Sequence, residues 1–244
     1  MKAILWREWL LFKRQFWKIT AAALTLPSLY MLAFGWGLGE RVQLPDQSYI
    51  SFIVPGIMAL ATMNISFSAV AVKLNIEKVY EKNLELMIMA PLRMPFFALA
   101  KISTGMLRGL YAASLICALA YLFGVSLQPG MQLLLLVVIN CLVFSALGFL
   151  AGMTVSSHQD LNRVNSFALV PMAFLCGTFF PLDQVPALAR HIILALPLTH
   201  SVQGMRAVAS GAAVPPGSLV ILAFYFLLFL GIGTWLSYRL DASS

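Results

Sequence analysis

The sequence predicts an all-α integral membrane protein with six transmembrane helices and an N-terminal amphipathic interfacial helix. It also predicts a cytoplasmic helix in the second connection and a broken, re-entrant outer hairpin between helices 5 and 6. Of the 244 residues, 61% are hydrophobic and only 10% are charged, whereas a soluble domain carries about 25% charged residues. Six apolar runs approach or exceed the length of about 20 residues that crosses a bilayer. This composition excludes a soluble globular protein.

The six apolar runs give the predicted spans and place the whole chain, residues 1–244, in one membrane domain. They cover residues 19–38, 50–72, 102–123, 131–155, 164–180 and 218–238. Pro27 and Pro55 interrupt two of these runs, which membrane helices tolerate because their neighbours satisfy the freed backbone groups.

The basic residues set the predicted orientation. Twelve of the 16 fall in the N-terminal segment, the second connection and the stretches after the fourth and sixth spans. The opposite side has only Arg41, Arg190 and Arg206, and Arg108 lies just inside the third span. Lys and Arg concentrate on the cytoplasmic side, so we expect both termini in the cytoplasm. The formal net charge of +7 then indicates contact with anionic lipid rather than with nucleic acid.

The N-terminal segment, residues 1–18, is amphipathic at helical spacing. Leu5, Trp9, Phe12 and Phe16 share one face, and the other face carries Arg7, Arg14 and Lys18. Such a helix is expected to lie on the cytoplasmic leaflet with its aromatic side chains among the lipid headgroups. It is either a membrane anchor alone or, in addition, a docking surface for a cytoplasmic partner.

The second connection, residues 73–97, is the largest cytoplasmic one. Glu77, Glu81 and Glu85 follow at i, i+4 and i+8, so they line one face of a helix that neighbouring lysines could pair with. An apolar patch around Leu86 then runs to Pro91. A solvated, salt-bridged helix explains the charges, but exposed apolar surface usually meets a partner. We favour docking to another protein.

Residues 177–211 are too polar and too rich in Pro and Gly for a single span. They predict two short amphipathic helices, 185–196 and 199–210, broken at Pro197 within an outer hairpin of residues 182–217. A broken helix at membrane depth survives only where protein or a water-filled cavity satisfies its backbone. This favours a protein that moves a cargo over a simple anchor.

The sequence has no constellation typical of catalysis or of a metal site. It contains no P-loop and no H-E-x-x-H motif, and Cys117, Cys141 and Cys176 lie in apolar runs without metal-ligand spacing. We therefore expect no catalytic residue, metal or cofactor in this chain. Mildly polar residues in the second and fifth spans are candidates to line a pathway, although bonding between helices also explains such residues: Asn64, Ser66, Ser68, Asn165, Ser166 and Thr178.

Three motifs resemble the membrane subunit of ABC-2 type exporters. They are YISFIVPG from Tyr49, ELMIMAPL from Glu85, and FFPLD from Phe179 together with PLTH from Pro197. The resemblance covers essentially the whole chain. One departure is Asn83-Leu84, where the family often has Gly-Thr before the coupling glutamate.

The resemblance implies a homodimer in the bacterial inner membrane that docks two separate ATP-binding cassette subunits, which would hold the ATP and Mg. Its cargo would be amphipathic: a drug, a lipid or a lipid-linked saccharide. The residues implied to couple to the ATPase are Glu77, Glu81, Glu85, Leu86, Ala90 and Pro91. The residues implied to form the outer gate are Phe180, Pro181, Leu182, Asp183, Pro197, Leu198 and His200.

Three other classes stay open at this point. A secondary carrier or channel usually places ionisable groups at mid-depth, and the predicted spans carry no acidic residue there. A lipid-modifying membrane enzyme would need clustered His, Asp and Glu, whereas His158, His191 and His200 do not cluster in sequence. An assembly or anchoring subunit without a pathway is the third class, and only a measurement of cargo flux with and without the motor would distinguish it from a transporter.

Overall fold

The computed structural model describes residues 2–37, 48–79, 94–125, 127, 130–182 and 185–241. Regular structure in these ranges is helical throughout. The elements are α1 (Lys2–Arg14), α2 (Phe16–Tyr30), η1 (Met31–Trp36), α3 (Tyr49–Val79), α5 (Met94–Leu122), α6 (Met131–Thr154), α7 (His158–Val164), η2 (Asn165–Leu169), α8 (Val170–Leu175), α9 (Ala187–Leu194), α10 (Pro197–Ala209) and α11 (Pro216–Asp241).

Five helical stretches in the described part of the chain are long and apolar enough to cross a membrane. They are Phe16–Gly35, Tyr49–Val79, Met94–Leu122, Met131–Thr154 and Pro216–Tyr238. The predicted fifth span, residues 164–180, is not among them. Its helical part ends at Leu175, after the π-helical turn η2, and Gly177 then adopts a φ of +72°. The predicted count of six is therefore not confirmed.

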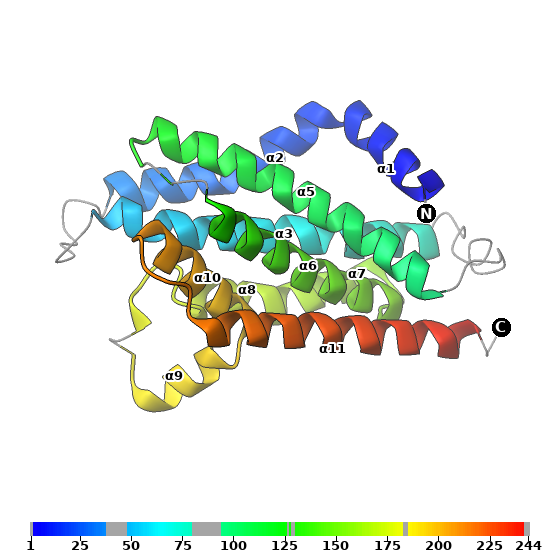
Figure 1. Cartoon of the computed structure of the whole chain (residues 1–244). Helices are drawn as coiled ribbons and strands as arrows, with labels where there is room; N and C mark the ends of the chain where they lie inside the picture. The colour runs from blue at the N-terminus through cyan, green and yellow to red at the C-terminus, as the bar shows by residue number, and fades with distance from the viewer. Residues whose placement is uncertain are drawn as a thin grey trace.

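The long helix α3 forms the centre of the bundle, with α5 and α6 packed along it (Figure 1). Its buried face includes Ile53, Ile57, Phe67 and Leu74, all 2% exposed or less. A side chain added at Gly148 of α6 would meet the backbone of Phe67. Small residues let membrane helices approach this closely. The hydrophobic effect does not drive helices together inside a bilayer, so close van der Waals contact contributes to their association instead.

Two helices extend about two turns beyond the predicted spans at the same end of the bundle. Helix α3 runs to Val79 rather than to residue 72, and α5 begins at Met94 rather than at residue 102. The added turns of α3 and α5 bury apolar side chains such as Leu74, Phe97 and Ala98 in one cluster. A hydropathy average over this stretch does not show that burial, because the stretch also contains charged residues. Glu77 consequently lies within α3.

The N-terminal segment is not one helix of 18 residues. Helix α1 ends at Arg14, Gln15 leaves the helical conformation (φ −111°, ψ 15°), and α2 begins at Phe16. The α1–α2 corner packs on α5, since the Phe12 ring meets the edge of Tyr111 and the Thr20 and Tyr111 hydroxyls hydrogen bond at 2.7 Å. Trp6, Trp9 and Trp17 remain exposed.

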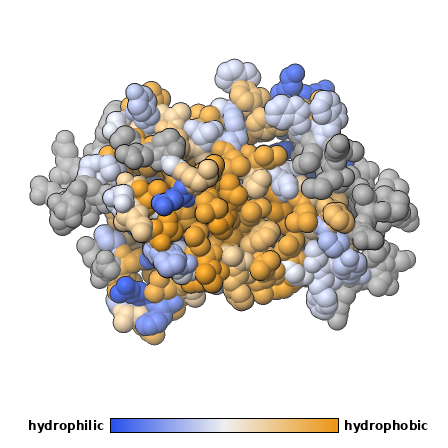
Figure 2. Space-filling model, in the orientation of Figure 1, coloured by the Kyte–Doolittle hydropathy of each residue, from blue (hydrophilic) through white to orange (hydrophobic). Residues whose placement is uncertain are grey.

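The bundle has two distinct ends. The two termini lie at one end, whereas α9 and α10 lie at the other (Figure 1). Figure 2 shows a broad hydrophobic zone across the middle of the visible face and more hydrophilic residues towards both ends. This banding is what a bilayer as solvent requires of a spanning bundle.

Candidate functional site: a groove and a capped hairpin

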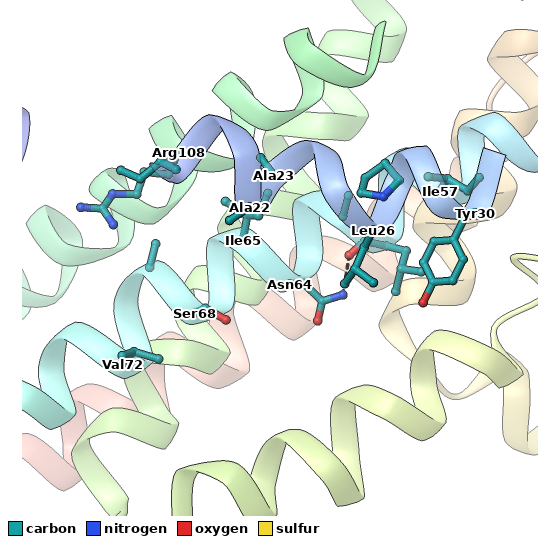
Figure 3. Close-up of a pocket in the computed structure, with 15 residues that line it drawn as sticks. Ala22, Ala23, Leu26, Tyr30, Ile57, Asn64, Ile65, Ser68, Val72 and Arg108 are labelled. Atoms are coloured by element: carbon teal, nitrogen blue, oxygen red, sulfur yellow. Dashed lines mark hydrogen bonds between the residues drawn. The ribbon is translucent and has the colours of Figure 1, made fainter. Parts of the chain in front are cut away.

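A groove with a cavity volume of about 400 Å³ lies between α2 and α3. Ala22, Ala23, Leu26 and Tyr30 line it from α2, and α3 lines it with the residues Ile57, Leu60, Ala61, Asn64, Ile65, Ser68, Ala69 and Val72. Figure 3 shows Tyr30 and Ile57 towards one end, Val72 and Arg108 towards the other, and Asn64 and Ser68 between them. The lining is thus mostly apolar with a few polar groups, the composition typical of ligand sites.

The structure separates the six predicted pathway residues into three groups. Asn64 and Ser68 line the groove, and the Asn64 amide donates to the Leu60 carbonyl at 3.1 Å. Asn165 and Ser166 lie exposed on η2. Ser66 and Thr178 are fully buried between helices.

The segments after the fifth run form a hairpin of two helices, α9 and α10, and Pro197 is the first residue of α10. Three side chains bind the carbonyls at the end of α9. Thr199 Oγ1 donates to the Ile193 carbonyl at 2.6 Å, His200 Nε2 lies 2.8 Å from the Leu194 carbonyl oxygen, and the Tyr225 hydroxyl donates to the Ala195 carbonyl.

These contacts explain the PLTH motif physically. A helix end leaves its last carbonyls without partners, and such groups are costly in a membrane. Pro197 starts α10 where its missing N–H is harmless, Leu198 is fully buried, and Thr199 and His200 reach back to cap α9.

The N-terminal end of α3 and the helix α10 meet the segment that follows α8. Tyr49 Oη donates to the Phe179 carbonyl at 2.9 Å. A side chain at Gly56 would meet Thr178 within 3.0–3.2 Å. Two segments that carry the family resemblance, far apart in sequence, therefore lie in direct contact.

Arg206 of α10 holds this junction together. Its Nε donates to the Phe52 carbonyl at 3.2 Å, and its terminal nitrogen donates to the carbonyls of Gly177 at 3.0 Å and Thr178 at 3.4 Å. The guanidinium carbon also lies 3.6 Å from the centroid of the Phe52 ring. Arg206 thereby ties α10 to α3 and to the turn at Gly177.

The predicted outer-gate residues that the structure describes differ in burial. Leu182, Pro197, Leu198 and His200 are buried, and Phe180 and Pro181 are half-buried. Asp183 lies outside the described residues. The buried set packs the hairpin against the bundle, since α10 contacts α3, α6 and α11.

Of the predicted coupling residues, the structure describes only Glu77. Its carboxylate is fully buried and is paired with Lys101 and Arg7, so it faces the interior and not an exposed docking surface. The expectation that Glu77 shares an exposed helix face is corrected in this respect, because α3 continues past it into the packed bundle. Glu81, Glu85, Leu86, Ala90 and Pro91 lie outside the described residues.

Sequence reasoning missed Arg206 and Lys101 as site residues. Both had been counted only towards orientation. A usable signal was present: each is a single cation with apolar neighbours in a stretch that packs into a membrane protein, and such residues usually have a specific partner.

Comparison with known proteins places the chain in a family. The family model described as ABC-2 type transporter matches residues 1–209. The chain is 27% identical over 209 residues to the inner membrane transport permease YadH of Escherichia coli, covering 82% of this chain and 81% of that protein. It is 27% identical over 212 residues to nodulation protein J of Rhizobium meliloti, covering 80% of this chain and 78% of that protein. The chain belongs to the ABC-2 type transporter family.

Proposed function

We propose that this chain is the permease subunit of an ATP-driven exporter, acting as a homodimer with two separate ATP-binding cassette subunits. The observation that carries the proposal is the α2–α3 groove in a chain of this family. The sequence has no P-loop of its own, so the ATP and Mg²⁺ would be held by the partner subunits. This chain would then supply the pathway and no catalytic residue.

The proposed orientation rests on the distribution of charge, and the proposed location rests on a relative. The termini share one end of the bundle (Figure 1), and the N-terminal segment carries several of the basic residues that favour the cytoplasmic side. The relative YadH is an inner membrane protein by name, which supports a bacterial inner membrane for this chain. The segment 80–93 would then face the cytoplasm, where an ATP-binding subunit could dock on Glu81, Glu85, Leu86, Ala90 and Pro91.

A second copy has an available surface. Phe167, Val170, Phe174 and Leu175 on η2 and α8 are 44–81% exposed. Asn165 and Ser166, also exposed on η2, add two polar residues to this mostly apolar strip. A homodimer that pairs these strips would put the polar residues of the fifth run beside a shared pathway.

The groove supports an amphipathic cargo. Its walls are apolar over most of their length, with Asn64 and Ser68 as the polar groups in the middle (Figure 3). A molecule with an apolar body would replace lipid there at little cost, and a polar headgroup would find a few hydrogen-bond partners. Drugs, lipids and lipid-linked saccharides all fit this description. In this proposal α9 and α10 re-enter from the outer face and close the exit.

The test of this function is pairing with a motor subunit. The chain should co-purify in lipid nanodiscs with a candidate ATP-binding subunit, such as one encoded next to its gene, and alter its vanadate-sensitive ATP hydrolysis. The double variant Glu85→Ala and Leu86→Arg should insert normally but lose this pairing. If no ATP-binding subunit binds the wild-type chain, or if the double variant exports normally, the docking assignment is wrong.

Blocking the groove should stop export without breaking that pairing. Ser68→Trp would fill the space between α2 and α3 with a large ring, and we expect cargo flux per transporter to fall by about tenfold or more. Ser103→Trp is the matched control, because Ser103 of α5 lies outside this groove and its hydroxyl bonds the Leu99 carbonyl at an exposed site. Flux into inverted vesicles measures both variants. Equal flux in the two would remove the groove from the pathway.

A further inference from the structure

A buried ionic junction joins three helices at the end of the bundle that carries the termini. The Glu77 carboxylate of α3 accepts two bonds from Lys101 Nζ of α5, at 2.7 and 2.9 Å. One of its oxygens also accepts a bond from the Arg7 guanidinium of α1 at 2.6 Å. Glu77 is fully buried and Lys101 is 2% exposed, whereas the Arg7 side chain is 38% exposed.

Stability alone is a weak reason for such an arrangement. Removing two charges from water costs several kcal/mol per ion, and apolar replacements of similar volume are often at least as stable. What a buried, bidentate pair does provide is one defined geometry, because a displaced charge would be left unpaired in an apolar interior. The junction therefore fixes how α1, α3 and α5 lie against one another.

The position of the junction in the chain is specific. Glu77 lies two residues before the end of α3, and Lys101 lies two turns after the start of α5. The chain between these helices is the segment 80–93, which contains the proposed docking residues. The Glu77–Lys101 pair thus ties together the two helices that flank this segment, and Arg7 adds the N-terminal helix to the same point.

We propose that Glu77 is a positioning residue for energy coupling: it makes α1, α3 and α5 move as one unit at the end of the bundle where the segment 80–93 connects α3 to α5. Motion of a docked ATP-binding subunit would then reach α3, which lines the groove with Asn64 and Ser68. The proposal rests on the proposed function, since it assigns the transmission step between motor and pathway. In the same proposal Arg7, the partly exposed residue of the junction, links the N-terminal helix α1 to Glu77.

The deciding readout is cargo moved per ATP hydrolysed, measured at equal amounts of folded protein. The double variant Glu77→Gln, Lys101→Met removes both buried charges with little change in volume, and the Arg7 charge that stays belongs to a side chain that is 38% exposed. We expect it to bind the ATP-binding subunit and to hydrolyse ATP, with the cargo-to-ATP ratio lowered about tenfold. A purely structural role would lower yield or melting temperature instead and leave that ratio unchanged.

A second variant keeps the test decisive if the double variant fails to fold. Arg7→Met keeps both charges of the buried Glu77–Lys101 pair and removes the bond from α1 to Glu77, and it should also lower the ratio. The matched control is Arg163→Met on α7, where Arg163 pairs with Asp160 at 2.7 Å in an exposed i,i+3 contact. An unchanged ratio in Arg7→Met, or an equal fall in Arg163→Met, would overturn the inference. Failure of the wild-type chain to bind any ATP-binding subunit would instead refute the proposed function.

Discussion

Replacing Gly148 with leucine should prevent the chain from accumulating as folded protein. Helix α6 crosses α3 so closely here that even a Cβ atom at Gly148 would lie 2.6 Å from the Phe67 carbonyl oxygen and 3.2 Å from its Cα. The obstacle is backbone in the middle of α3, which cannot move aside as the tip of a side chain can. Separating the two helices would open gaps around Phe67 and Phe144, and overpacking of this kind costs about 3 kcal/mol or more.

The matched control for this prediction is a glycine in another long apolar helix. A Cβ at Gly231 of α11 has nothing within 4 Å, so Gly231→Leu should fold at nearly the wild-type yield. Expression as a monodisperse peak in size-exclusion chromatography, followed by a melting curve, measures both variants. A Gly148→Leu protein with wild-type yield and melting temperature would show that α3 and α6 do not pack as the structure has them.

The centre of this fold could be predicted because its cause is local. Runs of apolar residues long enough for a bilayer appear directly in the sequence, and each of the five long helices in the described part of the chain overlaps a predicted span over most of that span's length. The fifth run was harder. The π-helical turn η2, which begins at Asn165, and the positive φ of Gly177 interrupt the run of residues 164–180. Hydropathy averaged over a window does not detect such local conformations.

The ends of the helices could not be predicted because their causes are distant in sequence. Helix α3 continues through Glu77 since Lys101 and Arg7, 24 and 70 residues away, satisfy its carboxylate. Reasoning along one helix face paired Glu77 with nearby lysines instead. Lys78 likewise binds the Met153 and Val155 carbonyls at the end of α6. These partners become neighbours only when the bundle forms.

The candidate site shows the same division. The break at Pro197 follows from proline chemistry alone, and the structure does begin α10 there. That Thr199, His200 and Tyr225 would cap α9 depends on the path of the chain around the hairpin. Asn64 and Ser68 line the groove while Ser66 does not, because the position of α2 beside α3 decides which face of α3 is open.

Replacing Arg206 with methionine should release the hairpin from the N-terminal end of α3. The change keeps a long apolar stem but removes the donors to the Phe52, Gly177 and Thr178 carbonyls and the contact with the Phe52 ring. Hydrogen bonds from a charged group are worth about 1.5–3 kcal/mol each, so local opening at this junction should become at least about tenfold more frequent. If α10 closes the exit, export should fall or become uncoupled from ATP.

Cys176 reports this opening directly. It is fully buried and precedes Gly177, so its alkylation by a small maleimide requires the junction to open, and mass spectrometry distinguishes it from Cys117 and Cys141. We expect Arg206→Met to accelerate Cys176 alkylation about tenfold, and Arg206→Lys to have a smaller effect because an ammonium keeps the charge but lacks the guanidinium fork. Arg163→Met, which removes an exposed charge from α7 outside the hairpin, should leave the rate unchanged. Equal rates in Arg206→Met and wild type would mean that other contacts hold the hairpin and that Arg206 contributes nothing to closure.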